Sequence, residues 1–221
     1  MSDPPARHGD DPHISLRLAR TNAEAHLYMD LHPCDACGAS DFHPRSSVVM
    51  IVHDLGSRYH GTCPSCGTER EFVFRIPEQT HAPSGDAVQY GDARPSELLD
   101  PGEWLWVADS ASGQGPADPS GLSPEETTRQ RYFLAVAVAA IAEVLKFVPE
   151  GADAVPDSAF VSERGHSVYA AEPGRFSKPR LEAVLGAYRD ISMRFGATRV
   201  DETIPGTTST ASNVDQEEST E

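Results

Sequence analysis

The chain has 221 residues, of which 38% are apolar, and its 34 acids against 18 bases give a formal net charge of −16 at pH 7. With 18 prolines and 17 glycines, much of this length is expected to be loop or tail. The charge disfavours a nucleic-acid partner, because affinity for phosphate backbones comes largely from Lys and Arg.

A membrane partner is also not expected. The longest uncharged apolar run spans residues 132–142, far below the roughly 20 residues that a membrane-spanning helix needs. The first residues show no basic stretch followed by an apolar run, which is the pattern of a secretory signal. We therefore expect a cytoplasmic protein.

Residues 1–13 are expected to be disordered, and a module of helix and strands follows over 14–80. "TNAE" at 21–24 has the pattern of a capping box, in which Thr21 accepts from the amide of Glu24 and the Glu24 carboxylate reaches back. A short helix running to about Leu31 is predicted. Residues 46–52 and 71–76 are β-branched and aromatic enough to form strands, and residues 57–61 are a candidate third strand.

All four cysteines of the chain lie in this module, in two C-x2-C pairs: Cys34, Cys37, Cys63 and Cys66. In a cytoplasmic protein this pattern indicates a metal site rather than disulfides. A glycine follows each pair and allows the backbone to turn with positive φ. Four thiolates around one ion form a closed tetrahedron, which suits zinc in a structural role.

The two CxxCG knuckles resemble those of the zinc-ribbon class over residues 34–76. The resemblance implies two cysteine knuckles at the ends of β-hairpins and says little about function. "CPSCG" also looks like one iron-binding half of rubredoxin, a small electron carrier, so iron is the alternative metal. The segment between the cysteine pairs is β-branched here, whereas rubredoxin is rich in aromatic residues around its iron.

Four histidines accompany the cysteines: His32, His43, His53 and His60. One of them can replace a thiolate or donate a hydrogen bond to a sulfur. Surface histidines in a turn-rich module are the alternative, which we favour.

Residues 81–122 form a predicted Pro/Gly-rich connector with one strand. In "EWLWVAD" at 103–109 the two tryptophans, Trp104 and Trp106, alternate with Leu105 and Val107. Such a strand either covers a core or presents a binding surface. We favour the first interpretation.

Residues 123–200 form a predicted helical part, followed by a disordered acidic tail over 201–221 with six acids and no base. "SPEE" at 123–126 carries the signals of a helix start, and the apolar run after it predicts a buried central helix reaching about Phe147. A final helix is predicted from about Ser177 to Gly196, with a short one capped by Ser162 before it.

Catalytic signatures are scarce. Ser162, Glu163 and His166 lie close together in sequence, but catalytic triads converge from distant segments. Arg175, Lys178 and Arg180 precede or open the last helix, where they form either an anion site or ordinary solvated charge.

The sequence thus predicts an α+β fold, in which a zinc ribbon with four cysteine ligands and a small antiparallel sheet is packed with or linked to a C-terminal helical part. The favoured hypothesis is a non-enzymatic, acidic protein–protein interaction module, either an adaptor or an inhibitor of immunity type, that binds a protein with a basic surface. An enzyme with an unrecognised site, a rubredoxin-like carrier and a nucleic-acid-associated ribbon are the alternatives.

Overall fold

The computed structural model describes residues 16–51, 54–78 and 88–196. The predicted disordered ends, 1–13 and 201–221, lie outside them. The described elements are α1 (Asn22–Leu31), β1 (Arg45–Ile51), β2 (Asp54–Thr62), β3 (Glu69–Arg75), α2 (Pro101–Ser112), α3 (Pro124–Leu145), the 3-10 helix η1 (Asp157–Ala159), α4 (Glu163–Ala171), the 3-10 helix η2 (Pro173–Phe176) and α5 (Lys178–Arg194). The predicted α+β class is confirmed.

The three predicted strands form one antiparallel sheet in the order β1-β2-β3. Val48 pairs with Ser57, and Ser57 pairs with Phe74, so these three side chains share one face of the sheet. On this face Phe74 is buried against Tyr28 of α1, with ring centroids 5.5 Å apart. The helix α1 therefore covers the aromatic part of the sheet.

The start of α1 agrees with the predicted cap in one half only. The Thr21 hydroxyl accepts from the amide of Glu24 at 3.1 Å, as expected. The Glu24 carboxylate, however, accepts from the amide of Arg20 at 2.7 Å, one residue before the cap. This position also brings the carboxylate to the Arg20 side chain.

The predicted strand over 103–109 is wrong. These residues belong to α2, whose N-cap Asp100 forms a complete capping box with Glu103 and precedes Pro101 at the first helical position. Trp104 is fully buried, whereas Trp106 is 40% exposed. In a helix these two residues point in different directions, so the tryptophans do not form one face.

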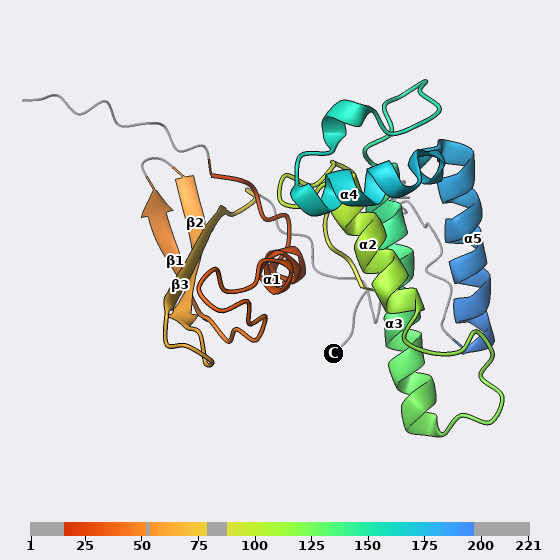
Figure 1. The fold of residues 1–221 in the computed structure, drawn as a ribbon, viewed down its shortest axis with the longest axis horizontal. Helices are drawn as coiled ribbons and strands as arrows, with labels where there is room; N and C mark the ends of the chain where they lie inside the picture. The colour runs from red at the N-terminus through yellow and green to blue at the C-terminus, as the bar shows by residue number, and fades with distance from the viewer. Residues whose placement is uncertain (1–15, 52–53, 79–87, 197–221) are drawn as a thin grey trace, which may run out of the picture.

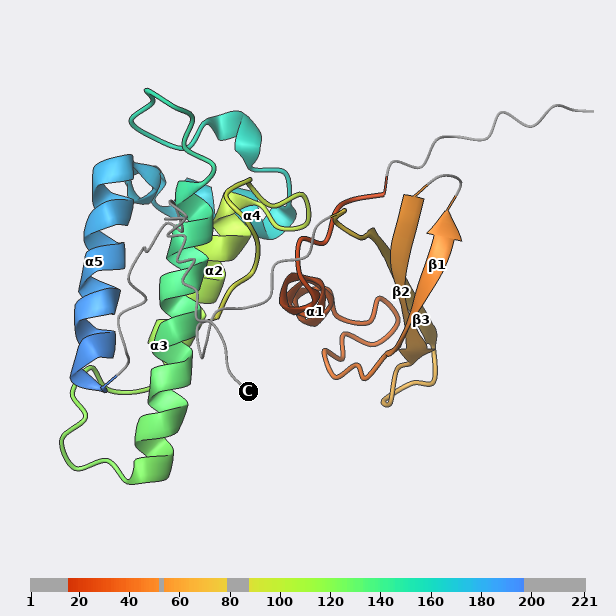
Figure 2. The same cartoon turned by 180° about the vertical axis from the view of Figure 1, so that it is seen from behind.

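The helices α2, α3 and α5 pack side by side, with α3 in the middle and α4 across the start of α2 (Figures 1 and 2). The predicted central helix is confirmed, although Tyr132 at the start of its apolar run is 60% exposed. The short helix capped by Ser162 and the final helix are also confirmed. Among the described residues, no helix combines the length and apolar character needed to cross a membrane.

We call residues 16–51 and 54–78 the sheet module, and residues 88–196 the helical body. One cluster of buried apolar side chains extends through both, from Tyr59 and Phe74 through Tyr28 to Trp104 and Ile141. In Figure 1, α1 lies between the sheet and the helices of the body. The module and the body thus share one core.

A buried ion cluster joins the two parts beside this core. The Arg20 guanidinium lies 2.6 Å from a Glu24 oxygen and 2.8 Å from a Glu143 oxygen of α3. Lys146 is 2.6 Å from the other Glu143 oxygen, and the Ser96 hydroxyl donates to Glu24. Such pairing compensates the loss of hydration of the buried charges.

Candidate metal centre

The two cysteine pairs lie on turns of the same design. The Gly38 amide donates to the Cys34 carbonyl at 2.7 Å, and the Gly67 amide donates to the Cys63 carbonyl at 2.9 Å. The glycines have φ values of 73° and 75°, which any other residue adopts only with strain. The local sequence CxxCG therefore accounts for the first part of each turn.

A further hydrogen bond closes each turn. The Cys34 amide donates to the carbonyl of Ala39 at 2.9 Å, and the Cys63 amide donates to that of Thr68 at 2.8 Å. The first knuckle follows α1, and the second connects β2 to β3. Pairing of the sheet and packing of α1 against it bring the two knuckles together.

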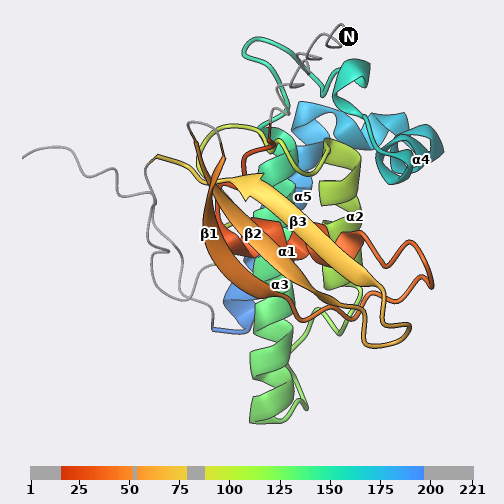
Figure 3. The same cartoon turned by 90° about the vertical axis from the view of Figure 1, so that its left-hand side faces the viewer.

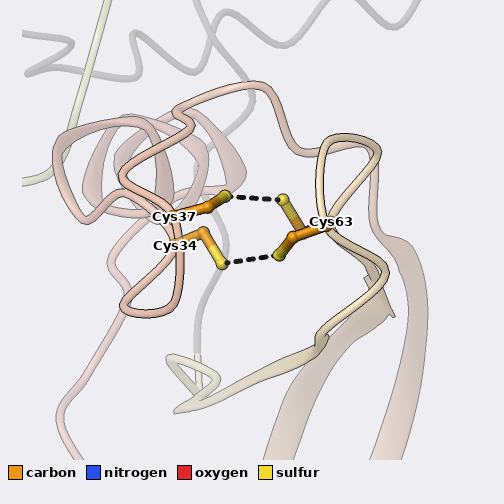
Figure 4. A group of neighbouring side chains, drawn as sticks. Cys34, Cys37 and Cys63 are labelled. Carbon is orange, nitrogen blue, oxygen red and sulfur yellow. Dashed lines mark hydrogen bonds between the residues drawn. The ribbon is translucent and has the colours of Figure 1, made fainter.

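The four sulfur atoms lie within 4.8 Å of one another. The Cys34 and Cys66 sulfurs are 3.7 Å apart, and those of Cys37 and Cys63 are 3.6 Å apart, as the dashed lines in Figure 4 mark. A tetrahedral ion with metal–sulfur bonds of about 2.3 Å requires sulfur–sulfur distances of about 3.8 Å. A disulfide would bring two sulfurs to about 2 Å. The geometry fits a four-coordinate metal ion.

Burial is asymmetric within each pair. The first cysteine of each knuckle, Cys34 or Cys63, is at most 2% exposed, whereas the second, Cys37 or Cys66, is exposed. The cluster thus has one side against the protein and one side toward solvent. All four positions of a tetrahedron are taken by the chain, which leaves none for a water or a substrate.

The surroundings of the sulfurs favour some thiolates more than others. Hydrogen bonding with the Thr68 hydroxyl and amide lowers the pKa of Cys66 to about 6, and the Cys66 amide, directed at the Cys63 sulfur, lowers the pKa of Cys63. The Ala39 amide lowers the pKa of Cys37, but hydrogen bonding to the neighbouring sulfurs, Cys66 foremost, outweighs it and raises that pKa to about 12. A bound cation would offset the repulsion between neighbouring thiolates, so that all four sulfurs can be ionised together.

The histidines that the structure describes do not join the cluster. The metal-binding group found among the described residues contains the four cysteines alone. The His32 ring nitrogen Nδ1 lies 2.7 Å from the Tyr28 carbonyl, and His43 lies 2.9 Å from Asp41 in an exposed pair. His60 is on β2, and His53 lies outside the described residues.

Arg70 is a structural residue of the centre that the sequence pattern did not reveal. It is only 8% exposed, and its guanidinium carbon lies 4.3 Å from the ring centroid of Phe42 and 5.4 Å from that of Phe72. It also donates to the His32 carbonyl. Arg70 thereby connects β3 to the segment that enters the first knuckle. The two residues are 38 positions apart, and no local sequence motif predicts such a contact.

The other candidate sites have structural partners. The Ser162 hydroxyl accepts from the Gly165 amide at 2.8 Å as the cap of α4, while His166 is exposed. Arg175 makes two hydrogen bonds of 2.7 and 2.6 Å to Asp109. Arg180 lies 2.7 Å from Glu172. Ser162 thus serves as a helix cap, and Arg175 and Arg180 are paired with acids, whereas Lys178 is exposed at the start of α5.

Comparison with known proteins found no significant match, whether the chain was scanned against protein-family models or searched against curated proteins and solved structures. The four clustered cysteines are compatible with a pair of zinc-ribbon-like knuckles.

Proposed function

We propose that this chain is a non-enzymatic protein–protein interaction module in which a structural zinc ion stabilises the sheet module. The observation that carries the proposal is the closed cysteine cluster, because four sulfurs at tetrahedral spacing leave no coordination position for chemistry. Thiolate ligands and this geometry favour zinc among the abundant divalent ions.

The connection between the two parts supports a binding role. A shared core and the buried Arg20–Glu143 ion pair hold the sheet module against the helical body. A surface composed of both parts is therefore rigid before a partner arrives. Preorganisation of this kind reduces the conformational entropy lost on binding.

The charge of the chain supports a basic partner. The net charge is −16, and residues 201–221 contribute six acids and no base. Such a charge accelerates the approach of a positively charged protein and repels nucleic acid. An adaptor and an inhibitor of a basic protein both match this description.

Metal analysis of the purified protein tests the zinc assignment first. We expect about one zinc per chain and a colourless protein. Iron with visible charge-transfer absorption would contradict the zinc assignment and favour an electron carrier instead.

Affinity capture from the native cell extract tests the interaction role. The baits are the wild type, Cys63→Ser and a chain ending at residue 200, each washed at about 0.05, 0.15 and 0.5 M salt. We expect one stoichiometric basic protein, lost with Cys63→Ser and weakened by salt or by truncation. A partner that is acidic, or is a nucleic acid held at about 0.15 M salt, would contradict the proposal.

A further inference from the structure

The two edges of the sheet differ. At the β3 edge, residues 17–19 run alongside: the Arg75 amide donates to the Arg17 carbonyl at 2.9 Å, and the Ala19 amide donates to the Arg75 carbonyl at 3.1 Å. At the other edge, β1 pairs with β2 alone among the described residues. Figure 3 shows β1 as the outer strand. Its outward backbone groups are a template for another strand.

Exposed apolar side chains continue from this edge. Val48 is 65% exposed, Met50 is 72% exposed, and Leu55, which pairs with Met50, is 51% exposed. All three lie on the face that carries Phe74, and their exposure shows that α1 does not cover them. An apolar group beside an open strand edge indicates a surface for association.

We propose that a second copy of this chain occupies the edge, with β1 pairing antiparallel to β1 of the partner about a two-fold axis at Val48. This register pairs all seven residues of β1. On the apolar face Val48 meets its symmetry mate, and Met50 lies opposite Ser46 of the other copy. The result is a continuous six-stranded sheet whose two apolar groups become one.

Charge complementarity supports a second copy as the occupant. Arg45 and Asp54 form no ion pair among the residues that the structure describes. In the proposed register Arg45 lies opposite Ile51 of the other copy, and Ile51 is paired with Asp54 on β2. These residues share the face opposite to Val48.

The distance suits an ion pair. Two strand spacings separate the Arg45 backbone from that of Asp54 in the other copy, about 10 Å. An extended arginine and an aspartate together span this length. The two-fold axis generates two such ion pairs, one at each end of the paired β1 strands. Arg45 and Asp54 of both copies are then all paired.

The expected complex is weak. One strand pair with three apolar side chains per copy buries less than the roughly 800 Å² per partner of a standard stable interface. Each copy also carries a net charge of −16, and this repulsion decreases with added salt. We therefore expect a reversible dimer that forms at high concentration and is strengthened by moderate salt.

Sedimentation velocity of the purified zinc-loaded full chain, from about 1 to about 500 µM, tests the proposal. The wild type should shift from monomer to dimer. Val48→Lys should remain a monomer, because two lysines would meet at the axis. The matched control is Val161→Lys, which adds the same charge at a 77% exposed valine on the helical body and should dimerise as the wild type does.

A charge exchange tests the register. Arg45→Asp places two acids together and should weaken dimerisation by about tenfold or more. Arg45→Asp combined with Asp54→Arg should restore it. Zinc content and circular dichroism equal to those of the wild type establish that each variant is folded.

Three outcomes would overturn the proposal: a wild type that stays monomeric throughout, equal effects of Val48→Lys and Val161→Lys, or no restoration by the double variant. Dimerisation only after removal of residues 197–221 would also overturn it, since the chain's own terminus would then be the occupant. Because the experiment contains no other protein, its failure leaves the proposed partner binding untouched.

Discussion

The sheet module and the helical body are stabilised by different means. In the helical body the largest fully buried side chains are apolar, among them Trp104, Phe176 and Ile141. In the sheet module the largest fully buried side chains are those of Met29, Glu24 and two of the four cysteines. Because the sheet module is small, the total apolar surface that it can bury is limited, and it needs a further source of stability.

The metal centre and the contact with the body supply that source. The cluster joins the chain after α1 to the β2–β3 turn, so it closes the module at the end of the sheet. The shared core and the ion cluster stabilise the other side. We therefore predict that metal loss unfolds the sheet module, whereas substitutions in the core destabilise the helical body.

Metal removal or Cys63→Ser should have the largest effect. The apparent binding free energy of a structural zinc is about 10–16 kcal/mol, comparable to the whole stability of a domain at about 5–15 kcal/mol. We expect amide hydrogen exchange in β1, β2 and β3 to lose its protection, while α3 and α5 remain protected. Hydrogen exchange with mass spectrometry measures both parts in one sample.

The matched control is Ser65→Ala, between the same two cysteines, which should retain zinc and protection. Equal loss of protection in the helical body and in the sheet module would show that the two parts unfold as one unit. It would contradict the inference that they are stabilised by different means.

Trp104→Ala should have the next largest effect, on the helical body. A fully buried tryptophan replaced by alanine costs about 3–5 kcal/mol through lost burial and the cavity left behind. Trp106→Ala is the control, because this side chain is 40% exposed and stacks on Arg164 at the surface. Chemical denaturation followed by circular dichroism should separate the two variants, and similar losses would contradict the assignment of Trp104 to the core.

The tryptophan segment shows where alternation misleads. A strand was expected because Trp104 and Trp106 alternate with Leu105 and Val107, but the preceding residues Asp100 to Glu103 form a capping box with proline at the first helical position. That signal was in the sequence and outweighs a short alternation. The helix buries Trp104, Leu105, Val107, Ala108 and Ala111, which follows helical spacing.

The metal centre, in contrast, was predictable from the sequence, because its motif fixes the local backbone geometry. Each knuckle is shaped within six residues by its own glycine and by backbone hydrogen bonds, so its geometry is local in the sequence. Contacts over long separations were not predictable: Arg20 meets Glu143 across 123 residues, and Arg70 meets His32 across 38. Such pairs depend on how whole elements pack, which a single sequence does not display.

Arg20→Leu should weaken the junction between the two parts. It leaves the buried Glu24 carboxylate without its cation, while Lys146 still compensates Glu143. We expect a loss of about 3 kcal/mol, the lower end for breaking a buried pair. Arg129→Leu removes an exposed pair with Glu125 and should change the stability by less than about 1 kcal/mol. Comparable effects of the two variants in urea denaturation would contradict the role of the ion cluster.

Glycine substitutions within the helical body give the smallest effects, and they differ in sign. A Cβ on Gly102 would lie 2.5 Å from the Cα of Gly165, because α2 and α4 cross there with their backbones in contact. Gly102→Ala must therefore separate the helices, at a cost of about 1–3 kcal/mol. In α5 a Cβ on Gly186 would have no atom within 4 Å, so Gly186→Ala should raise stability by about 0.5–1 kcal/mol through helix propensity.

Thermal denaturation of the zinc-loaded protein resolves these opposite shifts. Both substitutions add one methyl group to a helix, so propensity alone predicts stabilisation by each of them. A destabilised Gly102→Ala beside a stabilised Gly186→Ala would therefore isolate the cost of the helix crossing. Stabilisation by both would mean that α2 and α4 are farther apart in solution, and the hydrogen bonds of Asp100 to the amides of Val161 and Ser162 would then be absent as well.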